Sequence, residues 1–284
     1  MKIQELLRSG YDILKSQNIE TYMLDTQLIL CKVLNKDKLF IITNRDLQVE
    51  ENRRAEFLKL IELRKKKMPV KYILQSTEFM GLEYFIKPGV LIPRPDTEVL
   101  VEEAIKEIKK QNFKKICDVC CGSGAIGIAI ANYIDDSQVI CYDISEIALE
   151  VTQINLERFN LEERVQVLKS DLLSKAIENG CSFDVVVSNP PYIKSKVIGT
   201  LMEDVKNYEP FIALCGGEDG LDFYRRIIRE SKKVLNPKGL IIFEIGYDQK
   251  EQVTKLLEQN GFKDVVCIKD LSGNDRVIKG SLSY

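Results

Sequence analysis

The amino-acid sequence predicts an α/β fold: a mostly parallel sheet of seven strands with an antiparallel edge, preceded by a small helical bundle and a hairpin linker. Strand-like and helical runs alternate after residue 113, which is typical of a parallel sheet with helices on both faces. The first 70 residues instead show apolar spacings of three and four. Residues 1–87 also carry more basic than acidic side chains, whereas the rest carries more acidic ones. The 284 residues therefore divide into two unequal domains.

We expect a helical domain over residues 1–70. Three stretches show the helical spacing, and they contain Ile3, Leu6, Leu7, Tyr11 and Leu14, then Leu24, Leu28, Cys31 and Leu34, then Phe57, Leu60 and Ile61. Residues 64–67 form a basic cluster at the end of the last helix. Such a cluster interacts favourably with the helix dipole, and the alternative is contact with an acidic or RNA-bearing partner.

A β-hairpin linker is expected over residues 71–92. Tyr72-Ile73-Leu74 and residues 82–86 have strand character, and Gly81 lies between them. Prolines then stiffen the chain, and Asp96 or Thr97 can cap a helix that begins near Glu98.

Residues 93–284 are expected to form the sheet domain. Its strands are expected at 116–120, 138–142, 165–169, 184–187, 240–245, 263–269 and 276–280. Helical runs include 147–159, 223–235 and 249–260. The turn-like segment 272–274 joins the last two strands and predicts an antiparallel hairpin at the sheet edge.

Composition excludes several classes of function. The formal net charge of -2 gives no global attraction to nucleic acid or anionic lipid. There is no histidine, which excludes a histidine general base, a Ser-His-Asp triad and a histidine metal ligand. Cys117 and Cys120 form a C-x-x-C, but the second pair that a metal site usually needs is missing. No signal core and no run of ~18 apolar residues occur. We therefore expect a cytoplasmic protein with no membrane association and no metal.

A glycine-rich loop follows the first expected strand and opens a helix. It reads Cys120-Cys121-Gly122-Ser123-Gly124. Glycines let a ligand approach the backbone closely, and a helix N-terminus offers free N–H groups. A dinucleotide is disfavoured, because Cys120 replaces the first glycine of G-x-G-x-x-G and Asp118 would repel a pyrophosphate. Asp118 could instead hold a cationic amine, and a plain strand-to-helix turn is the structural alternative.

Acidic residues also end the next two expected strands. Asp143 stands where a doubly wound sheet binds ribose hydroxyls, and Ser170-Asp171-Leu172 follows the third strand, where an adenine amino group could bind. Each acid alone fits a helix cap, but three in succession favour a nucleoside pocket.

The segment after the fourth expected strand is the most informative. Asn189-Pro190-Pro191-Tyr192 cannot continue a sheet, because proline lacks the N–H of a central strand, so the backbone turns outward. The Asn189 side chain and the Pro190 carbonyl are then acceptors beside the flat ring of Tyr192. Such a group can hold an NH2 on an amide or an aromatic amine. A Pro-Pro turn with an Asn cap is the alternative.

These motifs carry a resemblance to a known family. Asn189–Tyr192 resembles the signature of S-adenosylmethionine-dependent methyltransferases that act on exocyclic or amide nitrogens, and residues 118–124 resemble their cofactor loop. Residues 89–98 and 216–221, in this order around the signature and behind a helical domain, are similar to the release factor glutamine methyltransferase (PrmC/HemK) family. The resemblance covers nearly the whole chain, weakly over residues 1–70, and implies a Rossmann-like methyltransferase domain.

The resemblance implies N5-methylation of the glutamine in the Gly-Gly-Gln motif of peptide chain release factors, with S-adenosylhomocysteine as product. By position, the cofactor residues are Asp118, Cys120, Cys121, Gly122, Ser123, Gly124, Asp143, Asp171, Leu172 and Asn189. Asn189, Pro190, Pro191 and Tyr192 hold the substrate glutamine, with Asn189 and Pro190 as the catalytic groups that accept the two amide N–H bonds. Residues 1–70 then contact the release factor, and we expect a monomer.

Several points stay open at this level. The family usually has glycine where Cys120 stands; if that position needs a positive φ, cysteine is strained by about 1 kcal/mol. Arg94, Thr97 and Glu98 fit either a role near the cofactor or a structural one. The alternatives are glutamine methylation of a ribosomal protein, N6-adenine methylation of nucleic acid, and a non-catalytic binding module. The acidic sheet domain disfavours a stable nucleic-acid complex, and the glycine order excludes a nicotinamide oxidoreductase.

Overall fold

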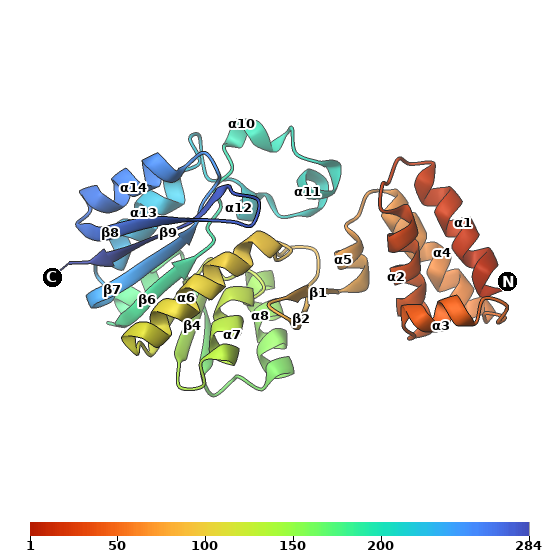
Figure 1. Ribbon diagram of the computed structural model, residues 1–284, viewed down its shortest axis with the longest axis horizontal. Helices are drawn as coiled ribbons and strands as arrows, with labels where there is room; N and C mark the ends of the chain where they lie inside the picture. Colours follow the sequence, from red (N-terminus) through yellow and green to blue (C-terminus); the bar gives the residue numbers. More distant parts are fainter. Residues whose placement is uncertain (284) are drawn as a thin grey trace. The chain divides into compact units, whose positions relative to one another are not determined.

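The computed structural model describes residues 1–283, which form two compact units (Figure 1). The first unit comprises Met1–Ser76 together with Met202–Tyr208, and the second comprises Thr77–Leu201 and the chain from Glu209 onward. The segment Met202–Tyr208 thus belongs with the helical unit, although it lies far along the chain, within the stretch that the sequence assigns to the sheet domain.

The first unit is helical. Its helices are α1 (Ile3–Lys15), α2 (Tyr22–Leu34), α3 (Lys38–Thr43), α4 (Glu51–Lys65), α5 (Val70–Leu74) and α11 (Glu203–Tyr208). The apolar faces of α1 to α5 share one core that includes Leu6, Ile29 and Phe57, whereas α11 contributes no buried residue. Arg64 is not a surface cation, because its Nε donates to Asp25 Oδ2 at 2.7 Å and only 8% of the residue is exposed.

One expectation for this unit is wrong. Tyr72-Ile73-Leu74 is not a strand but the end of α5, which begins after Pro69 and ends at Gln75 in the left-handed conformation. Pro69 sets the φ of the residue before the helix, and burial of Tyr72 and Ile73 against the bundle stabilises the helical turn. The helix expected from the spacing of Leu24, Leu28, Cys31 and Leu34 is present as α2, and its buried apolar residues are Ile29, Leu30 and Val33.

A β-hairpin follows α5 in the sequence and precedes the strands of the large sheet. Its strands are β1 (Ser76–Phe79) and β2 (Leu82–Phe85). Met80 and Gly81 form the turn, with φ values of 51° and 69°, as a tight hairpin requires. The Glu98 carboxylate accepts a hydrogen bond from the Met80 backbone N–H at 2.7 Å, which gives Glu98 a structural contact.

The second unit contains the expected sheet. Its strands are β3 (Lys115–Val119), β4 (Gln138–Asp143), β5 (Val165–Lys169), β6 (Phe183–Ser188), β7 (Leu235–Glu244), β8 (Phe262–Lys269) and β9 (Asp275–Leu282). Its helical segments are η1 (Pro95–Thr97), α6 (Glu98–Gln111), α7 (Ala125–Tyr133), α8 (Glu146–Phe159), α9 (Ser174–Glu178), α10 (Ser195–Ile198), α12 (Phe211–Leu214), α13 (Asp222–Ser231) and α14 (Lys250–Gln259).

The strand order confirms the predicted fold class. Within residues 1–283 the sheet has seven strands in the order β5-β4-β3-β6-β7-β9-β8. Neighbouring strands from β5 to β7 are parallel, and β9 is antiparallel to both β7 and β8. After β3, the next two strands in the chain, β4 and β5, lie on one side of it, and the following strands, β6 and β7, lie on the other. Where the strand order reverses in this way, a crevice forms at the carboxyl ends of the strands.

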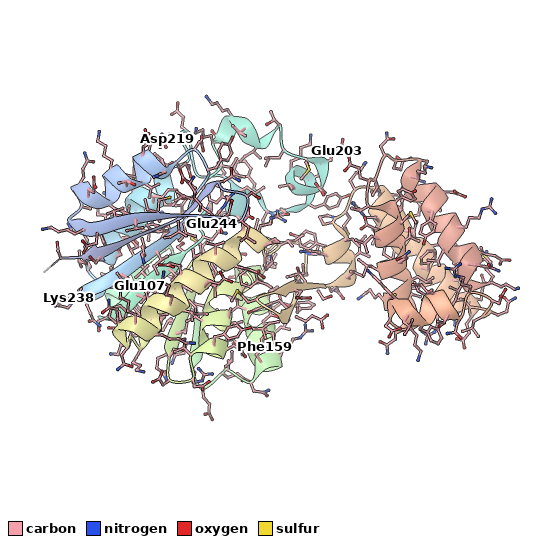
Figure 2. The ribbon with its side chains drawn as sticks, viewed as in Figure 1. Glu107, Phe159, Glu203, Asp219, Lys238 and Glu244 are labelled. Atoms are coloured by element: carbon pink, nitrogen blue, oxygen red, sulfur yellow. The ribbon has the colours of Figure 1, made fainter. Side chains whose placement is uncertain are left out.

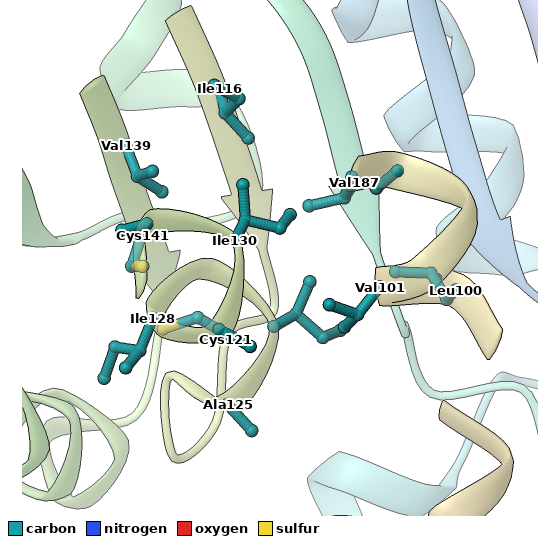
Figure 3. Packing of buried hydrophobic residues seen from close by; sticks show 14 of the residues in the cluster. Leu100, Val101, Ile116, Cys121, Ala125, Ile128, Ile130, Val139, Cys141 and Val187 are labelled. Atoms are coloured by element: carbon teal, nitrogen blue, oxygen red, sulfur yellow. The ribbon is translucent and has the colours of Figure 1, made fainter. Parts of the chain in front are cut away.

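Helices cover both faces of this sheet, because successive strand residues point to opposite sides. On one face, Ile116, Val139 and Val187 pack with α6 and α7, as Figure 3 shows. On the other, Cys117, Val186 and Phe243 belong to a core shared with α13 and α14. Among the described helices, none is long and apolar enough to cross a membrane.

Candidate active site

The candidate site is a cavity of about 310 Å³ at the carboxyl edge of the parallel strands. Segments that end or follow four adjacent strands line it: Cys120 and Gly122 after β3, Asp143, Ile144 and Ser145 at β4, Ser170, Asp171 and Leu172 after β5, and Asn189 and Pro191 after β6. Gly89, Val90, Leu91, Pro210, Ile212, Ala213 and Phe223 are among the other lining residues. The structure thus brings the strand tips singled out by the sequence to one place, where doubly wound sheets bind ligands.

The glycine-rich loop presents its backbone to this cavity. Cys120 has a φ of 61°, so it occupies the left-handed conformation and is strained by about 1 kcal/mol relative to glycine. Gly122 has open space where a Cβ would stand, which lets a ligand approach closely. Cys121, Ser123 and Gly124 belong to the same loop but are not among the lining residues. Burial raises the pKa of the Cys120 thiol well above its usual value, so it is a thiol and not a thiolate.

Two side chains hold the loop in place. Asp143 Oδ2 accepts from the Gly122 N–H and Oδ1 from the Ser145 N–H, both at 2.9 Å. Asn155, on α8, donates to the Ser123 carbonyl at 2.9 Å and also bonds both backbone groups of Phe85. Burial raises the pKa of Asp143, opposed by the backbone N–H groups. The sequence analysis missed Asn155, because an asparagine within an amphipathic helix gives no signal of its own.

Asp118 lies beneath the cavity rather than in its wall. It is fully buried, its Oδ2 accepts from the Gly127 N–H at 2.9 Å, and its Oδ1 has no hydrogen-bond partner among residues 1–283. Burial raises the pKa of this carboxyl from 3.8 to about 7, and the nearby Asp143 adds to the rise. Asp118 therefore supports the start of α7 and carries a proton at mildly acidic pH.

This buried carboxyl predicts a specific pH dependence of stability. Its folded-state pKa of about 7 lies above the unfolded value of 3.8, so its contribution is fully present below 3.8 and is lost as the pH rises through 7. Between these limits Asp118 lowers the free energy of unfolding by at most about 1.4 kcal/mol per pH unit. Urea unfolding from pH 4 to pH 8 of the wild type and of Asp118→Asn isolates this term. Equal pH slopes for the two proteins would contradict it.

The segment after β5 lies at the rim of the cavity. Leu172 lines it with a φ of 50°, a second strained residue in the same wall. Asp171 Oδ2 accepts from Arg226 Nη2 at 2.8 Å, and the Asp171 side chain is half exposed. Arg226 is a lining residue that the sequence analysis did not select.

The Asn189–Tyr192 segment crosses the cavity floor after β6. Asn189 and Pro191 line the cavity, whereas Pro190 is buried and Tyr192 lies outside the lining set. Asn189 Nδ2 donates to Thr97 Oγ1 at 3.2 Å, and in the described part of the chain its Oδ1 accepts no hydrogen bond. The residue that lines the cavity therefore has a free amide oxygen, available to a donor on a ligand.

A buried polar cluster stands behind this segment. Glu244, at the end of β7 (Figure 2), is 2% exposed and accepts from Thr97 Oγ1 at 2.5 Å and from the Tyr192 hydroxyl at 3.1 Å. Burial raises the pKa of Glu244, while the Thr97 bond, the positive charge of Arg276 and the Tyr192 bond lower it. α6 begins at Glu98 as expected. Of the two expected caps, Thr97 makes no capping bond, because its hydroxyl donates to Glu244 instead.

Arg94 makes an ion pair in the second unit, since its Nη2 lies 2.5 Å from Glu209 Oε1. No group of three or more metal-ligating side chains occurs in residues 1–283. The cavity can bind a ligand with hydroxyl and amino groups against the glycine-rich loop. The Asn189–Tyr192 segment can present amide acceptors to a second, planar NH2 group.

Comparisons with known proteins point to the same chemistry. A family model described as "Methyltransferase small domain" matches residues 95–205, and one described as "PrmC N-terminal domain" matches residues 5–74. A release factor glutamine methyltransferase from Clostridium botulinum is 58% identical over 279 residues, which cover 98% of this chain and 99% of the relative. One from Clostridium acetobutylicum is 54% identical over 278 residues, 98% of each chain.

A solved structure supports the fold alone. The Thermus thermophilus 16S rRNA N2 methyltransferase in complex with AdoMet and guanosine is 20% identical, with a TM-score of 0.51. The match covers 72% of this chain and 49% of that chain.

Proposed function

Because the chain belongs to the release factor glutamine methyltransferase family, we propose that it methylates the N5 atom of the glutamine in the Gly-Gly-Gln motif of peptide chain release factors. The methyl donor is S-adenosylmethionine, and S-adenosylhomocysteine is the product. One observation carries the proposal: Asn189, whose Oδ1 accepts no hydrogen bond within residues 1–283, lines a cavity that also presents Asp143 and the glycine loop.

The cavity fits this cofactor. Each Asp143 oxygen makes one backbone bond and keeps a lone pair, so the carboxylate can also accept from ribose hydroxyls. Gly122 leaves open space, and Leu91 and Leu172 offer apolar surface to a purine. When bound, S-adenosylmethionine supplies an electrophilic methyl group on a positively charged sulfur.

The Asn189–Tyr192 segment orients the amide group of the substrate glutamine. An amide nitrogen is a poor nucleophile, because its lone pair is delocalised into the carbonyl. Asn189 Oδ1 and the Pro190 carbonyl accept the two N–H bonds of the glutamine amide and fix its plane. Such positioning lowers a barrier by several kcal/mol, and preorganised acceptors stabilise the positive charge that grows on the nitrogen. No strong base is needed, because the N–H becomes acidic only as the methyl group arrives. The nitrogen then loses one proton to solvent, which leaves the neutral methylated amide and S-adenosylhomocysteine.

Tyr192 and the helical unit complete the proposal. Burial raises the pKa of the Tyr192 phenol, and Glu244 adds to the rise, so the hydroxyl stays protonated. The Tyr192 ring packs on the plane of the substrate amide. The first unit, whose sequence matches the "PrmC N-terminal domain" model, contacts the release factor. We further propose that the protein acts in the cytoplasm as a monomer and forms no stable complex with nucleic acid.

The test is methyl transfer from labelled S-adenosylmethionine. The substrates are a purified release factor, the same factor with the glutamine of its Gly-Gly-Gln motif changed to alanine, a ribosomal protein fraction and adenine-containing DNA. We expect label only on the first. Label on the altered factor, on ribosomal protein or on DNA would replace the proposal with one of the alternatives.

A further inference from the structure

The hydrogen bonds that link Asn189 to Thr97 and Thr97 to Glu244 have a fixed order of donors and acceptors. Tyr192 and Thr97 both bond to the carboxylate of Glu244, and Asn189 bonds to Thr97. An ionised carboxylate only accepts hydrogen bonds, so the Thr97 hydroxyl must donate its single proton to Glu244. The Thr97 oxygen is then left as an acceptor.

That direction determines how the Asn189 amide is turned. The group that meets the Thr97 oxygen must be the donor, which is Nδ2, at 3.2 Å. The amide oxygen is thereby turned away from Thr97, toward the cavity that Asn189 lines. The two ends of an amide have nearly the same shape, so packing alone selects between them poorly, whereas hydrogen bonds select strongly.

We propose that Glu244, acting through Thr97, is a positioning residue that holds the Asn189 amide with its oxygen toward the substrate. The inference rests on the proposed function in one respect, namely that Asn189 accepts from the NH2 of the substrate glutamine. Neither Glu244 nor Thr97 is among the residues that line the cavity, so both act on the reaction only through Asn189, which does line it.

The opposite orientation of Asn189 would be unproductive. A turned amide would present its NH2 to the NH2 of the substrate, so two donors would meet and neither would find an acceptor. The same turn would place Oδ1 against the Thr97 oxygen, whose proton is already committed to Glu244. The second fault is costly because Thr97 is 4% exposed and Glu244 is 2% exposed, and water cannot replace the lost bond.

Arg276 favours the accepting, ionised form of the Glu244 carboxylate and opposes the rise in its pKa that burial and the charge of Asp96 cause. It pairs with Asp270 at 3.1 Å and with Asp96 at 3.2 Å, and its charge also favours ionised Glu244. Thr97 and Tyr192 donate to the Glu244 carboxylate, and Arg276 lies close enough for its charge to act on it. These three groups favour Glu244 as a fixed hydrogen-bond acceptor.

The test compares Thr97→Val, which removes the hydroxyl at nearly constant volume, with Thr97→Ser, which keeps it. For Thr97→Val we expect kcat with the release factor to fall by about 10- to 100-fold, while the dissociation constant for S-adenosylmethionine stays within about threefold of wild type. Thr97→Ser should restore most of kcat. Thr254→Val, on α14 and outside the cavity lining, is the matched control and should have no effect.

A second readout needs no turnover. The side-chain NH2 signals of Asn189, assigned in ¹H–¹⁵N spectra by their absence in Asn189→Ala, should exchange slowly with solvent in wild type and in Thr97→Ser. In Thr97→Val and in Glu244→Gln they should shift and exchange faster. Glu244→Gln replaces an accepting oxygen by a donor and removes a buried charge, so it tests the same device if Thr97→Val folds poorly.

The possible outcomes distinguish failure of the positioning role of Glu244 and Thr97 from failure of the proposed function. If wild type methylates the factor but Thr97→Val and Glu244→Gln keep its kcat and its Asn189 signals, the positioning role is overturned. If wild type methylates no release factor, the proposed function fails, and the Asn189 signals still decide the orientation of the amide.

Discussion

Asn189→Ala is expected to lower kcat for methylation of a release factor by about 10²- to 10³-fold, a loss comparable to that of one preorganised polar group in an active site. The substitution removes the Oδ1 acceptor that faces the cavity and also the Nδ2 that satisfies Thr97. The glutamine amide then has one fixed acceptor instead of two and can rotate away from the attacking geometry.

The binding of S-adenosylmethionine should change little in this variant. The glycine loop is held by Asp143 and Asn155, neither of which bonds to Asn189. Calorimetric titration measures the dissociation constant, and single-turnover kinetics measure the chemical step. Asn179→Ala, at an exposed helix end with no side-chain capping bond, is the matched control. Equal loss of cofactor binding and of turnover in Asn189→Ala would remove Asn189 from the proposed clamp.

The sheet and the strand-tip residues could be predicted because each strand gives a local signal. Parallel strands buried on both faces appear as apolar runs, and the polar residue that ends such a run marks the carboxyl edge. Asp143 and Asn189 both stand at such points, and the structure places both in the cavity wall. The conditional expectation for Cys120 is also met, since its φ is 61°.

Other features depend on contacts that no local pattern records. Residues 28–34 are apolar almost all round the helix, so spacing predicts α2 but not which side is buried. Tyr72-Ile73-Leu74 has β-propensity, yet packing against the bundle makes it helical. Short segments of this kind are determined by their tertiary neighbours.

The cluster behind Asn189 shows the same limit at the site itself. Thr97 precedes a helix and therefore resembles a cap, whereas its true partner, Glu244, is 147 positions away. One signal was present, because Glu244 is the single acid within an apolar strand that ends at the cavity edge. An acid in such a position needs hydrogen-bond donors, and the sequence could have prompted a search for them.

Asp143→Ala is expected to produce the other large effect, on cofactor affinity. Hydrogen bonds to a charged group contribute about 1.5–3 kcal/mol each, so loss of the ribose contacts should raise the dissociation constant for S-adenosylmethionine about 100-fold or more. The loss has a second cause, because Asp143 also holds Gly122 and Ser145 at 2.9 Å and the loop would relax without it. Titration calorimetry with S-adenosylmethionine and S-adenosylhomocysteine measures both constants. Asp135→Ala, on an exposed turn, is the control.

The two variants should differ in which kinetic constant they change. At saturating cofactor, Asp143→Ala should recover kcat to within about tenfold of wild type, whereas Asn189→Ala should not, because excess cofactor cannot restore a lost amide acceptor. The two side chains lie on different strand tips and share no hydrogen bond, so their effects on kcat/KM should add to within about 0.5 kcal/mol in a double variant. A coupling much larger than this would mean that the loop after β3 and the segment after β6 form one cooperative unit, and the assignment of cofactor and amide to separate walls would fail.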